Sequence, residues 1–217
     1  MNQGTPKAGV VGTQCALVTG ASSGIGEAIA REYARREDKL QRLADELRAQ
    51  VPVEVVPADL SDSAAPAALV EEIHRRDLKV RILVNNAGYG VAGRYLANDW
   101  ATHAAFLQVM IGAVSELTWR LLPDIRSSGN GRIINVASVA GLVPGADGQT
   151  LYAAVKSYLV KFSESLAVEN KSHGVHGCAL CPGFTQSEFH DVTGTRSMMN
   201  KLPNRFGCKR VSLPAQA

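Results

Sequence analysis

The sequence alternates between short apolar runs and longer amphipathic stretches, and this alternation restricts the fold more than any other feature. The apolar runs are expected to be strands and span residues 15–19, 53–57, 80–84, 132–136 and 175–181. Helical patterns fill most of the intervals between them, and strands that alternate with helices favour a parallel sheet. The sequence therefore predicts an α/β protein built on such a sheet.

Composition narrows the class of protein. The chain has 217 residues, of which 46% are hydrophobic, and this suits one globular domain with a sizeable core. The net charge of +3 is too small to suggest a nucleic-acid partner. The first residues lack the apolar core of a secretory signal, and no apolar run looks long enough to span a bilayer. We therefore expect a soluble cytoplasmic protein with no membrane or nucleic-acid role.

Cysteine and histidine spacing gives no metal site. Cys178 and Cys181 form a CxxC pair, but there is no second pair and no histidine in a ligand pattern nearby. The pair is read as two small apolar residues in a strand rather than as a redox or zinc motif.

A glycine-rich turn follows the first expected strand and opens a helix. Gly20, Gly24 and Gly26 have the spacing G-x-x-x-G-x-G, which differs from the dinucleotide-binding pattern G-x-G-x-x-G. Glycines in such a turn let a pyrophosphate approach the backbone amides at a helix N-terminus. A purely structural turn remains the alternative.

Polar residues stand at the ends of two further strands. Asp59 follows the run at residues 53–57, and Asn86 follows the run at residues 80–84. Ligands of open α/β sheets bind beyond the carboxyl ends of the strands. Taken singly, each residue is better explained as a cap or turn residue than as a ligand contact.

Tyr152 and Lys156 lie four residues apart on an expected helix, so their side chains project from the same face. A nearby ammonium favours the phenolate and would adapt the pKa of a tyrosine to proton transfer. Ser138, at the end of the strand at residues 132–136, could hold a substrate oxygen beside the phenol. An exposed pair on a surface helix is the alternative for an isolated match.

Taken together, these motifs carry a family resemblance. The glycine turn, Asp59-Leu60, Asn85-Asn-Ala-Gly88, Ser138, Tyr152-x-x-x-Lys156 and Pro182-Gly183 occur in order and at near-family spacing. Over about residues 14–190 the chain resembles the short-chain dehydrogenase/reductase family. The resemblance implies a doubly wound, Rossmann-like parallel sheet. It also implies transfer of a hydride between NAD(P) and an alcohol or carbonyl substrate, a small molecule.

The resemblance also assigns roles to residues. Tyr152 would be the general acid/base, Lys156 would lower its pKa and bind the nicotinamide ribose, and Ser138 would position the substrate oxygen. The remaining residues would contact the cofactor: Gly20, Ser22, Ser23, Gly24, Ile25 and Gly26 at the pyrophosphate, Asp59 and Leu60 at the adenine, Asn86, Ala87 and Gly88 along the cleft, and Pro182, Gly183 and Thr185 at the nicotinamide.

The chain departs from the family pattern in three places. The second strand is missing, so that Arg35 or Arg36 would follow the first helix directly; either could meet a 2′-phosphate, which favours NADP(H) with NAD(H) as the alternative. The alternative is that both arginines are ordinary exposed helix residues.

The second departure is Met110, which replaces an asparagine that in the family helps hold a water near the lysine. The end of the chain lacks the pattern of the family's last helix and strand, which weakens the expectation of a homo-oligomer.

These departures leave two functional readings open. The first is an active oxidoreductase; the second is an impaired relative, or a protein that binds or senses the cofactor without turnover. We expect one Rossmann-like domain at residues 14–190, a flexible or disordered segment at residues 1–13 and an atypical tail at residues 191–217.

Overall fold

The computed structural model describes residues 12–21, 25–26 and 54–183. These residues form a four-stranded parallel sheet in the order β1-β2-β3-β4. Its strands are β1 (Thr13–Val18), β2 (Leu78–Asn85), β3 (Arg132–Val136) and β4 (His176–Leu180). The predicted parallel α/β, Rossmann-like sheet is confirmed, and four of the five expected strands form.

The strand register brings the carboxyl ends of the strands to one edge. Val18 pairs with Val84, Asn85 with Asn135, and Val136 with Leu180. The residues that follow β1, β2, β3 and β4 therefore leave the sheet along the same edge. This is the edge at which open parallel sheets bind their ligands.

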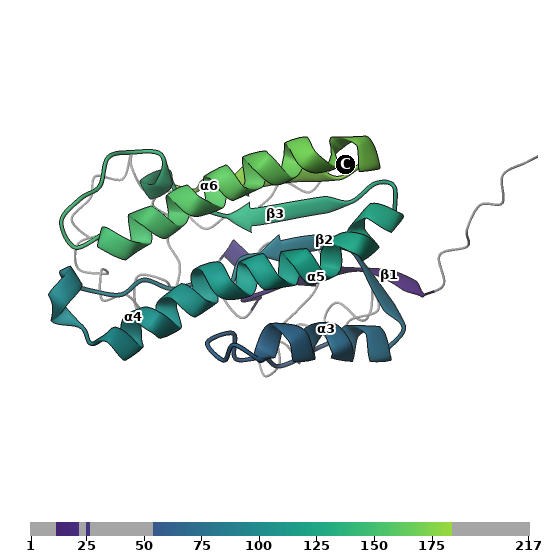
Figure 1. Ribbon diagram of the computed structural model, residues 1–217, viewed down its shortest axis with the longest axis horizontal. Coiled ribbons are helices and arrows are strands. Elements are labelled where there is room, and N and C mark those ends of the chain that lie inside the picture. Colours follow the sequence, from purple (N-terminus) through teal and green to yellow (C-terminus); the bar gives the residue numbers. More distant parts are fainter. Residues whose placement is uncertain (1–11, 22–24, 27–53, 184–217) are drawn as a thin grey trace, which may run out of the picture.

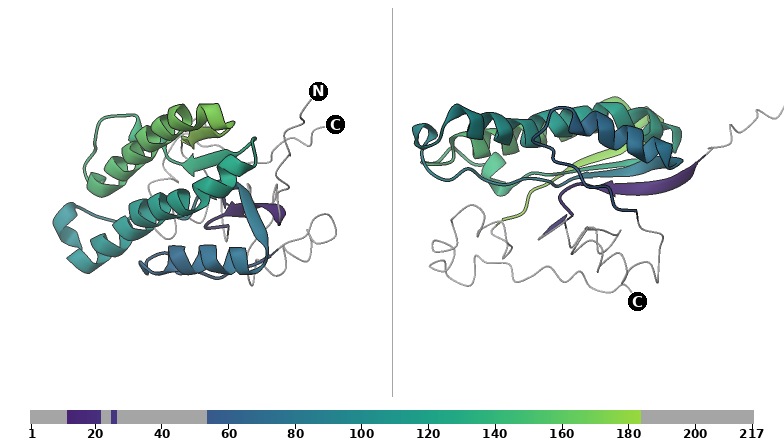
Figure 2. Two further views of the ribbon diagram at one scale, coloured as in Figure 1. Left: turned by 45° about the vertical axis from the view of Figure 1, so that its right-hand side comes forward. Right: turned by 90° about the horizontal axis from the view of Figure 1, so that it is seen from below.

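Three helical connections cross one face of the sheet. They are α3 (Ala65–Arg75), the pair α4 (Trp100–Leu107) and α5 (Ala113–Ser127), and α6 (Thr150–Asn170). Figures 1 and 2 show all of them on the same side. Short 3-10 turns, Tyr95–Ala97, Val139–Gly141 and Lys171–His173, complete the connections. Residues 27–50 lie outside the described part, as do the predicted loss of the second strand and the altered tail.

The long helix begins after a side-chain cap at Asp99. Asp99 accepts a hydrogen bond from the Thr102 amide at 2.8 Å, which satisfies one of the unpaired donors of the first turn. A π-helical turn, Gln108–Gly112, joins α4 to α5. Such turns often occur at functional sites.

Within the described residues, the stretch Trp100–Ser127 has the length and composition to cross a membrane. The expectation that no run reaches this length is thus corrected, because α4, the π turn and α5 join into one helical stretch. Core helices of soluble proteins pass the same test. Leu117, Leu121 and Ile125 of this stretch pack in the core beneath it.

The main core lies between these helices and the sheet. Leu83 and Ile133 of the sheet meet Leu117 and Leu121 of α5, and each of the four is at most 1% exposed. Burying one such side chain stabilises the fold by about 1.5–3 kcal/mol. Apolar residues of two expected strands and of α5 thus pack against each other.

A ladder of buried polar side chains crosses this core. The Asn85 amide donates to Thr118 at 3.2 Å and to the Asn135 carbonyl oxygen at 2.8 Å. The Asn135 amide donates in turn to the Ser163 hydroxyl at 2.8 Å. The ladder joins β2 and β3 to α5 and α6, and a hydrogen-bonded network of this kind favours one relative placement of the elements.

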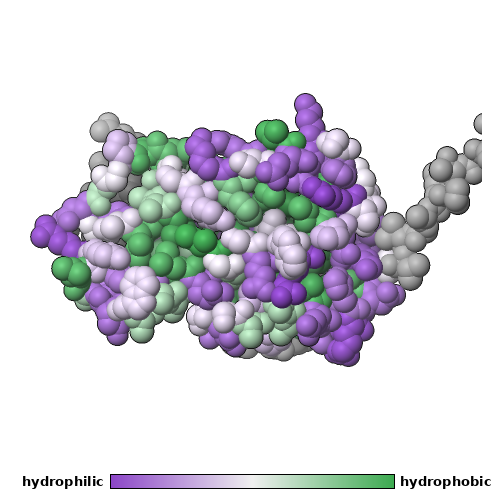
Figure 3. Space-filling model, viewed as in Figure 1, coloured by the Kyte–Doolittle hydropathy of each residue, from purple (hydrophilic) through white to green (hydrophobic). Residues whose placement is uncertain are grey.

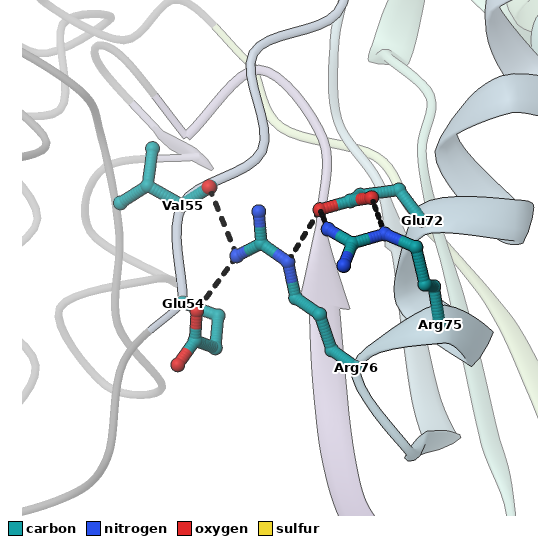
Figure 4. Close-up of polar contacts among 5 residues, drawn as sticks. All are labelled: Glu54, Val55, Glu72, Arg75 and Arg76. Atoms are coloured by element: carbon teal, nitrogen blue, oxygen red, sulfur yellow. Dashed lines mark hydrogen bonds and ion pairs between the residues drawn. The ribbon is translucent and has the colours of Figure 1, made fainter.

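The strand expected at residues 53–57 does not form in the described residues 54–57, which carry no regular secondary structure. A strand needs a partner ladder, and within the described residues β1 pairs only with β2. Side chains hold this segment instead. Arg76 donates to Glu54 at 2.6 Å and to the Val55 carbonyl at 3.4 Å, and it also binds Glu72 of α3 (Figure 4).

Candidate active site

The turns after β1 and β2 are tied together at the carboxyl edge of the sheet. The Thr19 hydroxyl accepts hydrogen bonds from the backbone amides of Asn86 at 3.1 Å and Ala87 at 3.0 Å. The Asn86 side-chain amide donates to the carbonyls of Thr19 at 3.1 Å and Gly20 at 2.9 Å. Asn86 therefore positions the glycine turn, a role that its place in the sequence did not reveal.

Two glycines of this turn are required by close approach. A Cβ on Gly20 would lie 2.5 Å from the Ala87 Cα, and Gly20 has a positive φ of 59°. A Cβ on Gly26 would clash with the Asn86 side chain. Ile25 and Gly26 have helical backbone, as the predicted start of a helix requires. The turn thus closes against residues 86 and 87 with no space for a side chain between them.

Asp59 and Leu60 lie near the same edge. The Asp59 carboxylate accepts from the Ser61 amide at 2.9 Å and from its hydroxyl at 2.7 Å, and these bonds lower the pKa of Asp59. Burial raises the pKa of Tyr89, and the charge of Asp59 adds to this shift. Leu60 packs against two core clusters. Asp59 is exposed, and its hydrogen bonds are those of a turn residue.

Ser138 sits at the start of a 3-10 turn that packs against α6. Its hydroxyl accepts from the Ala140 amide at 3.2 Å and hydrogen-bonds with Tyr152. The Val139 amide donates to the Pro182 carbonyl at 3.1 Å, so the segment after β4 also reaches this turn, and Gly183 follows it. Ser138, Tyr152 and Pro182 are therefore brought to one place from three different connections.

Gly141 lets this turn approach the helix closely. A Cβ there would lie 2.5 Å from the Lys156 backbone carbonyl carbon. The Gly141 carbonyl also accepts from the Ser157 hydroxyl at 2.7 Å. The sequence analysis did not identify Gly141. The only hint in the sequence was a glycine three positions after Ser138.

Lys156 is buried, and Tyr152 is half-buried beside it. Lys156 is 6% exposed, its Nζ donates to the Val136 carbonyl at 2.7 Å, and the same nitrogen lies 5.6 Å from the centre of the Tyr152 ring. The alternative of an exposed surface pair is therefore wrong. The ends of β3 and the start of α6 hold the ammonium beside the phenol.

Burial dominates the electrostatics of the pair. It lowers the pKa of Lys156 to about 8 and raises the pKa of Tyr152, and the hydrogen bond from Ser138 opposes the shift at Tyr152. The expected lowering of the Tyr152 pKa by Lys156 is not found in this arrangement. The physical reason is that Lys156 is buried and Tyr152 half-buried, and loss of water disfavours the charged form of each.

Met110 lies next to the Asn-Asn-Ala-Gly segment. It is 1% exposed and belongs to the π turn, and a Cβ on Gly88 would lie 2.7 Å from its Sδ. A thioether at this place fills space but offers only weak hydrogen bonding.

Several predicted site residues lie outside the described part of the chain: Ser22, Ser23, Gly24, Arg35, Arg36 and Thr185. The described residues contain no cluster of three or more histidine, cysteine or acidic side chains placed to hold a metal ion. The described portion of the candidate site therefore consists of the two tied turns, Asp59-Leu60 and the Ser138–Tyr152–Lys156 group.

Comparison with known proteins places this geometry in a family. The model of the short chain dehydrogenase family matches residues 14–197. The chain is 34% identical over 192 residues to oxidoreductase UcpA of Salmonella typhimurium, covering 84% of this chain and 73% of that protein.

Solved structures agree with the sequence match. A short-chain dehydrogenase from Sphingobium yanoikuyae in complex with NADPH superposes with a TM-score of 0.79 at 30% identity, covering 90% of this chain and 79% of that one. L-Sorbose reductase from Gluconobacter frateurii, complexed with NADPH and L-sorbose, gives a TM-score of 0.75 at 26% identity, covering 94% of this chain and 87% of that one. The chain therefore belongs to the short-chain dehydrogenase/reductase family of oxidoreductases.

Proposed function

We propose that this chain is an NAD(P)-dependent oxidoreductase that interconverts an alcohol and a carbonyl compound. The observation that carries the proposal is the convergence of Ser138, Tyr152 and Lys156 at the carboxyl edge of the sheet. The NADPH complexes of two similar proteins support the same chemistry.

The described residues fit a dinucleotide. Gly20 and Gly26 pack against Asn86 and Ala87 where a Cβ would clash. Gly26 lies at the start of a helix, where backbone amides can bind a phosphate. Gly20, Gly26, Asn86, Ala87 and Lys156 would hold the cofactor there. Bound nicotinamide would supply or accept the hydride. NADP(H) is our preferred form because of Arg35 and Arg36.

The protein's own groups would handle the proton. In the reductive direction, the Tyr152 hydroxyl would donate its proton to the substrate oxygen while that oxygen accepts a hydrogen bond from Ser138. The Lys156 ammonium would stabilise the resulting phenolate. In the oxidative direction, the phenolate would accept the proton from the alcohol. The raised pKa of Tyr152 keeps its hydroxyl protonated in the free protein, which is the form that the reductive direction needs.

A two-step experiment tests this proposal. Thermal unfolding would first be followed with NADPH and with NADH; at a concentration of 100 times Kd, a bound cofactor adds about 2.7 kcal/mol of stability. Turnover would then be measured on a panel of ketones and aldehydes. Tyr152→Phe should lower kcat by about 100-fold or more.

Tyr158→Phe is the matched control. It removes a hydroxyl from the same helix, one that hydrogen-bonds Ser115 at 2.7 Å, away from the proposed chemistry. It should leave kcat close to the wild-type value. Absence of stabilisation by either cofactor would overturn the proposal. Cofactor binding without turnover on the whole panel would instead support the second reading, an impaired or cofactor-sensing relative.

We further propose that the chain forms a homo-oligomer in the cytoplasm. Apolar side chains gather on the helical face between α5 and α6 (Figure 3). On these two helices Trp119 is 72% exposed and Val168 is 79% exposed. Light scattering of the purified protein would measure its mass; a monomer across the micromolar range would contradict this part of the proposal.

A further inference from the structure

Helix α6 carries Tyr152 and Lys156, but it begins without a side-chain cap. Gln149 stands at the cap position, and no described side chain there bonds to the first-turn amides. The amides at the start of a helix have no partner within the helix. The Ala153 amide donates to the Gln149 carbonyl at 3.0 Å, which leaves the amides of Thr150 and Leu151 ahead of the first helical bond.

A small cavity adjoins this end of the helix. Its volume is about 20 Å³, which is enough for one water molecule. Its walls include Thr150, Leu151 and Tyr152 of α6, Gly93 and Tyr95 of the loop after β2, and His103 of α4. Figure 1 shows α4 and the start of α6 at the same end of the molecule.

His103 lines this cavity and carries a polar atom that lacks a partner among the described residues. The residue is 6% exposed, and its ring stacks on Tyr95 with 4.9 Å between the ring centres. Its Nε2 lies 2.8 Å from the Tyr95 carbonyl oxygen. A carbonyl only accepts, so Nε2 carries the hydrogen and Nδ1 of the neutral ring is an acceptor. Nδ1 is buried and has no hydrogen-bond partner among the described residues.

We propose that one water molecule occupies this cavity and caps α6. The water accepts a hydrogen bond from the Leu151 amide and donates one to His103 Nδ1. A single water would thus supply the missing hydrogen-bond partner of both His103 Nδ1 and the Leu151 amide. His103 would thereby fix the first turn of α6 and act as a positioning residue for Tyr152. This catalytic consequence rests on the proposed function, whereas the water site itself does not.

A hydroxyl group of the substrate is the alternative occupant of the cavity, because it is similar in size to a water molecule and can also donate and accept hydrogen bonds. The two occupants differ in when they protect the helix start. A water protects the first turn in the free protein, whereas a substrate group protects it only when substrate is bound.

Hydrogen exchange of the full-length protein, without cofactor or substrate, tests the site. The wild type should exchange the amides at residues 150–152 slowly. His103→Phe keeps an aromatic ring against Tyr95 but removes both nitrogens, and should speed this exchange about tenfold. His103→Asn keeps an acceptor at the position of Nδ1 and should restore slow exchange. His176→Phe, at an exposed histidine, is the matched control and should change nothing in this segment.

The catalytic consequence has its own measurement. His103→Phe should lower kcat while the KM for NADPH changes by less than about twofold, because the water site adjoins Tyr152 and not the glycine turn. His103→Asn should recover kcat. If the wild type has no turnover at all, the proposed function fails, but the exchange result still decides the water site.

Three results would overturn the inference. The first is unchanged exchange at the start of α6 in His103→Phe, and the second is wild-type protection that appears only with substrate. The third result does not depend on a variant that folds. It is a high-resolution crystal structure of the wild type that shows no oxygen within about 3 Å of both His103 Nδ1 and the Leu151 nitrogen.

Discussion

The Asn86 side-chain amide donates to the Gly20 carbonyl at 2.9 Å and so ties the loop after β2 to the glycine turn after β1. Asn86→Ala would remove this bond and the one to the Thr19 carbonyl. We expect a loss of about 1–2 kcal/mol in the free energy of unfolding and, because the turn loosens, a weaker NADPH complex by about tenfold. Urea unfolding and a fluorescence titration measure the two effects.

Asn98→Ala is the control for this variant. Its side-chain amide donates to the Ala92 carbonyl at 2.8 Å, away from the glycine turn. It should leave the NADPH affinity unchanged. Equal losses of affinity in both variants would show that Asn86 has no specific role at the turn.

Gly141→Ala tests the close packing of the Ser138 turn on α6. Its Cβ would lie 2.5 Å from the Lys156 carbonyl carbon, which is helix backbone and cannot move aside. We expect a loss of about 1–3 kcal/mol in stability and a fall in kcat, because the turn shifts away from Tyr152. At Gly145 a Cβ meets no atom within 4 Å, so Gly145→Ala should be close to neutral in stability and in kcat. Similar behaviour of the two variants in unfolding and turnover assays would contradict the packing argument.

Lys156 should make stability rise with pH in the alkaline range. Burial lowers its pKa from 10.5 to about 8, so between these values the unfolded chain binds more protons than the folded one. Stability then increases as pH rises through this window and is flat below it as far as Lys156 is concerned. Urea unfolding from pH 7 to 10.5 measures the slope.

Lys156→Met isolates the contribution of this group, since Cys15 and Tyr152 have raised pKa values and titrate with the opposite sign. The difference between wild type and variant should carry the positive slope. A difference that does not change between pH 8 and 10.5 would mean that the Lys156 ammonium is not disfavoured by burial.

Met110→Asn tests the departure inside the π turn. An amide beside Gly88 would offer the hydrogen bonds that the thioether does not supply. If proton transfer limits turnover, kcat should rise about tenfold, a part of the roughly 100- to 10,000-fold that general acid–base catalysis contributes. Met110→Leu keeps an apolar side chain and should leave kcat near the wild-type value. No gain in Met110→Asn, provided that it folds and binds NADPH, would show that Met110 does not limit proton transfer.

Local sequence pattern predicted some strands correctly and one strand wrongly. The run at residues 132–136 forms β3 with the predicted bounds: the alternate residues Ile133 and Asn135 are buried on one face, and Val136 is buried as well. The run at residues 53–57 has the same apolar character and forms no strand in its described residues. A strand is completed by hydrogen bonds to another segment, and those depend on partners distant in the sequence.

Some features of the candidate site could be predicted from local sequence, and others depend on the tertiary structure. Tyr152 and Lys156 could be paired from their spacing because a helix places residues four apart on one face. Their burial, the hydrogen bond from Ser138 and the acceptor at Val136 could not be predicted, because each comes from another connection of the fold. His103 gave no signal at all in the sequence, since a single histidine on an apolar helix has no characteristic spacing.

By itself, the sequence determined the parallel α/β class, the order of the motifs and the chemical groups that meet at one edge of the sheet. Periodicity and spacing are local properties and are sufficient for this. Only the tertiary structure decided which groups are buried, which way the pKa values of Tyr152 and Lys156 move, and that Asn86 holds the glycine turn. These properties depend on what packs around each side chain, and the packing is set by segments far apart in the chain.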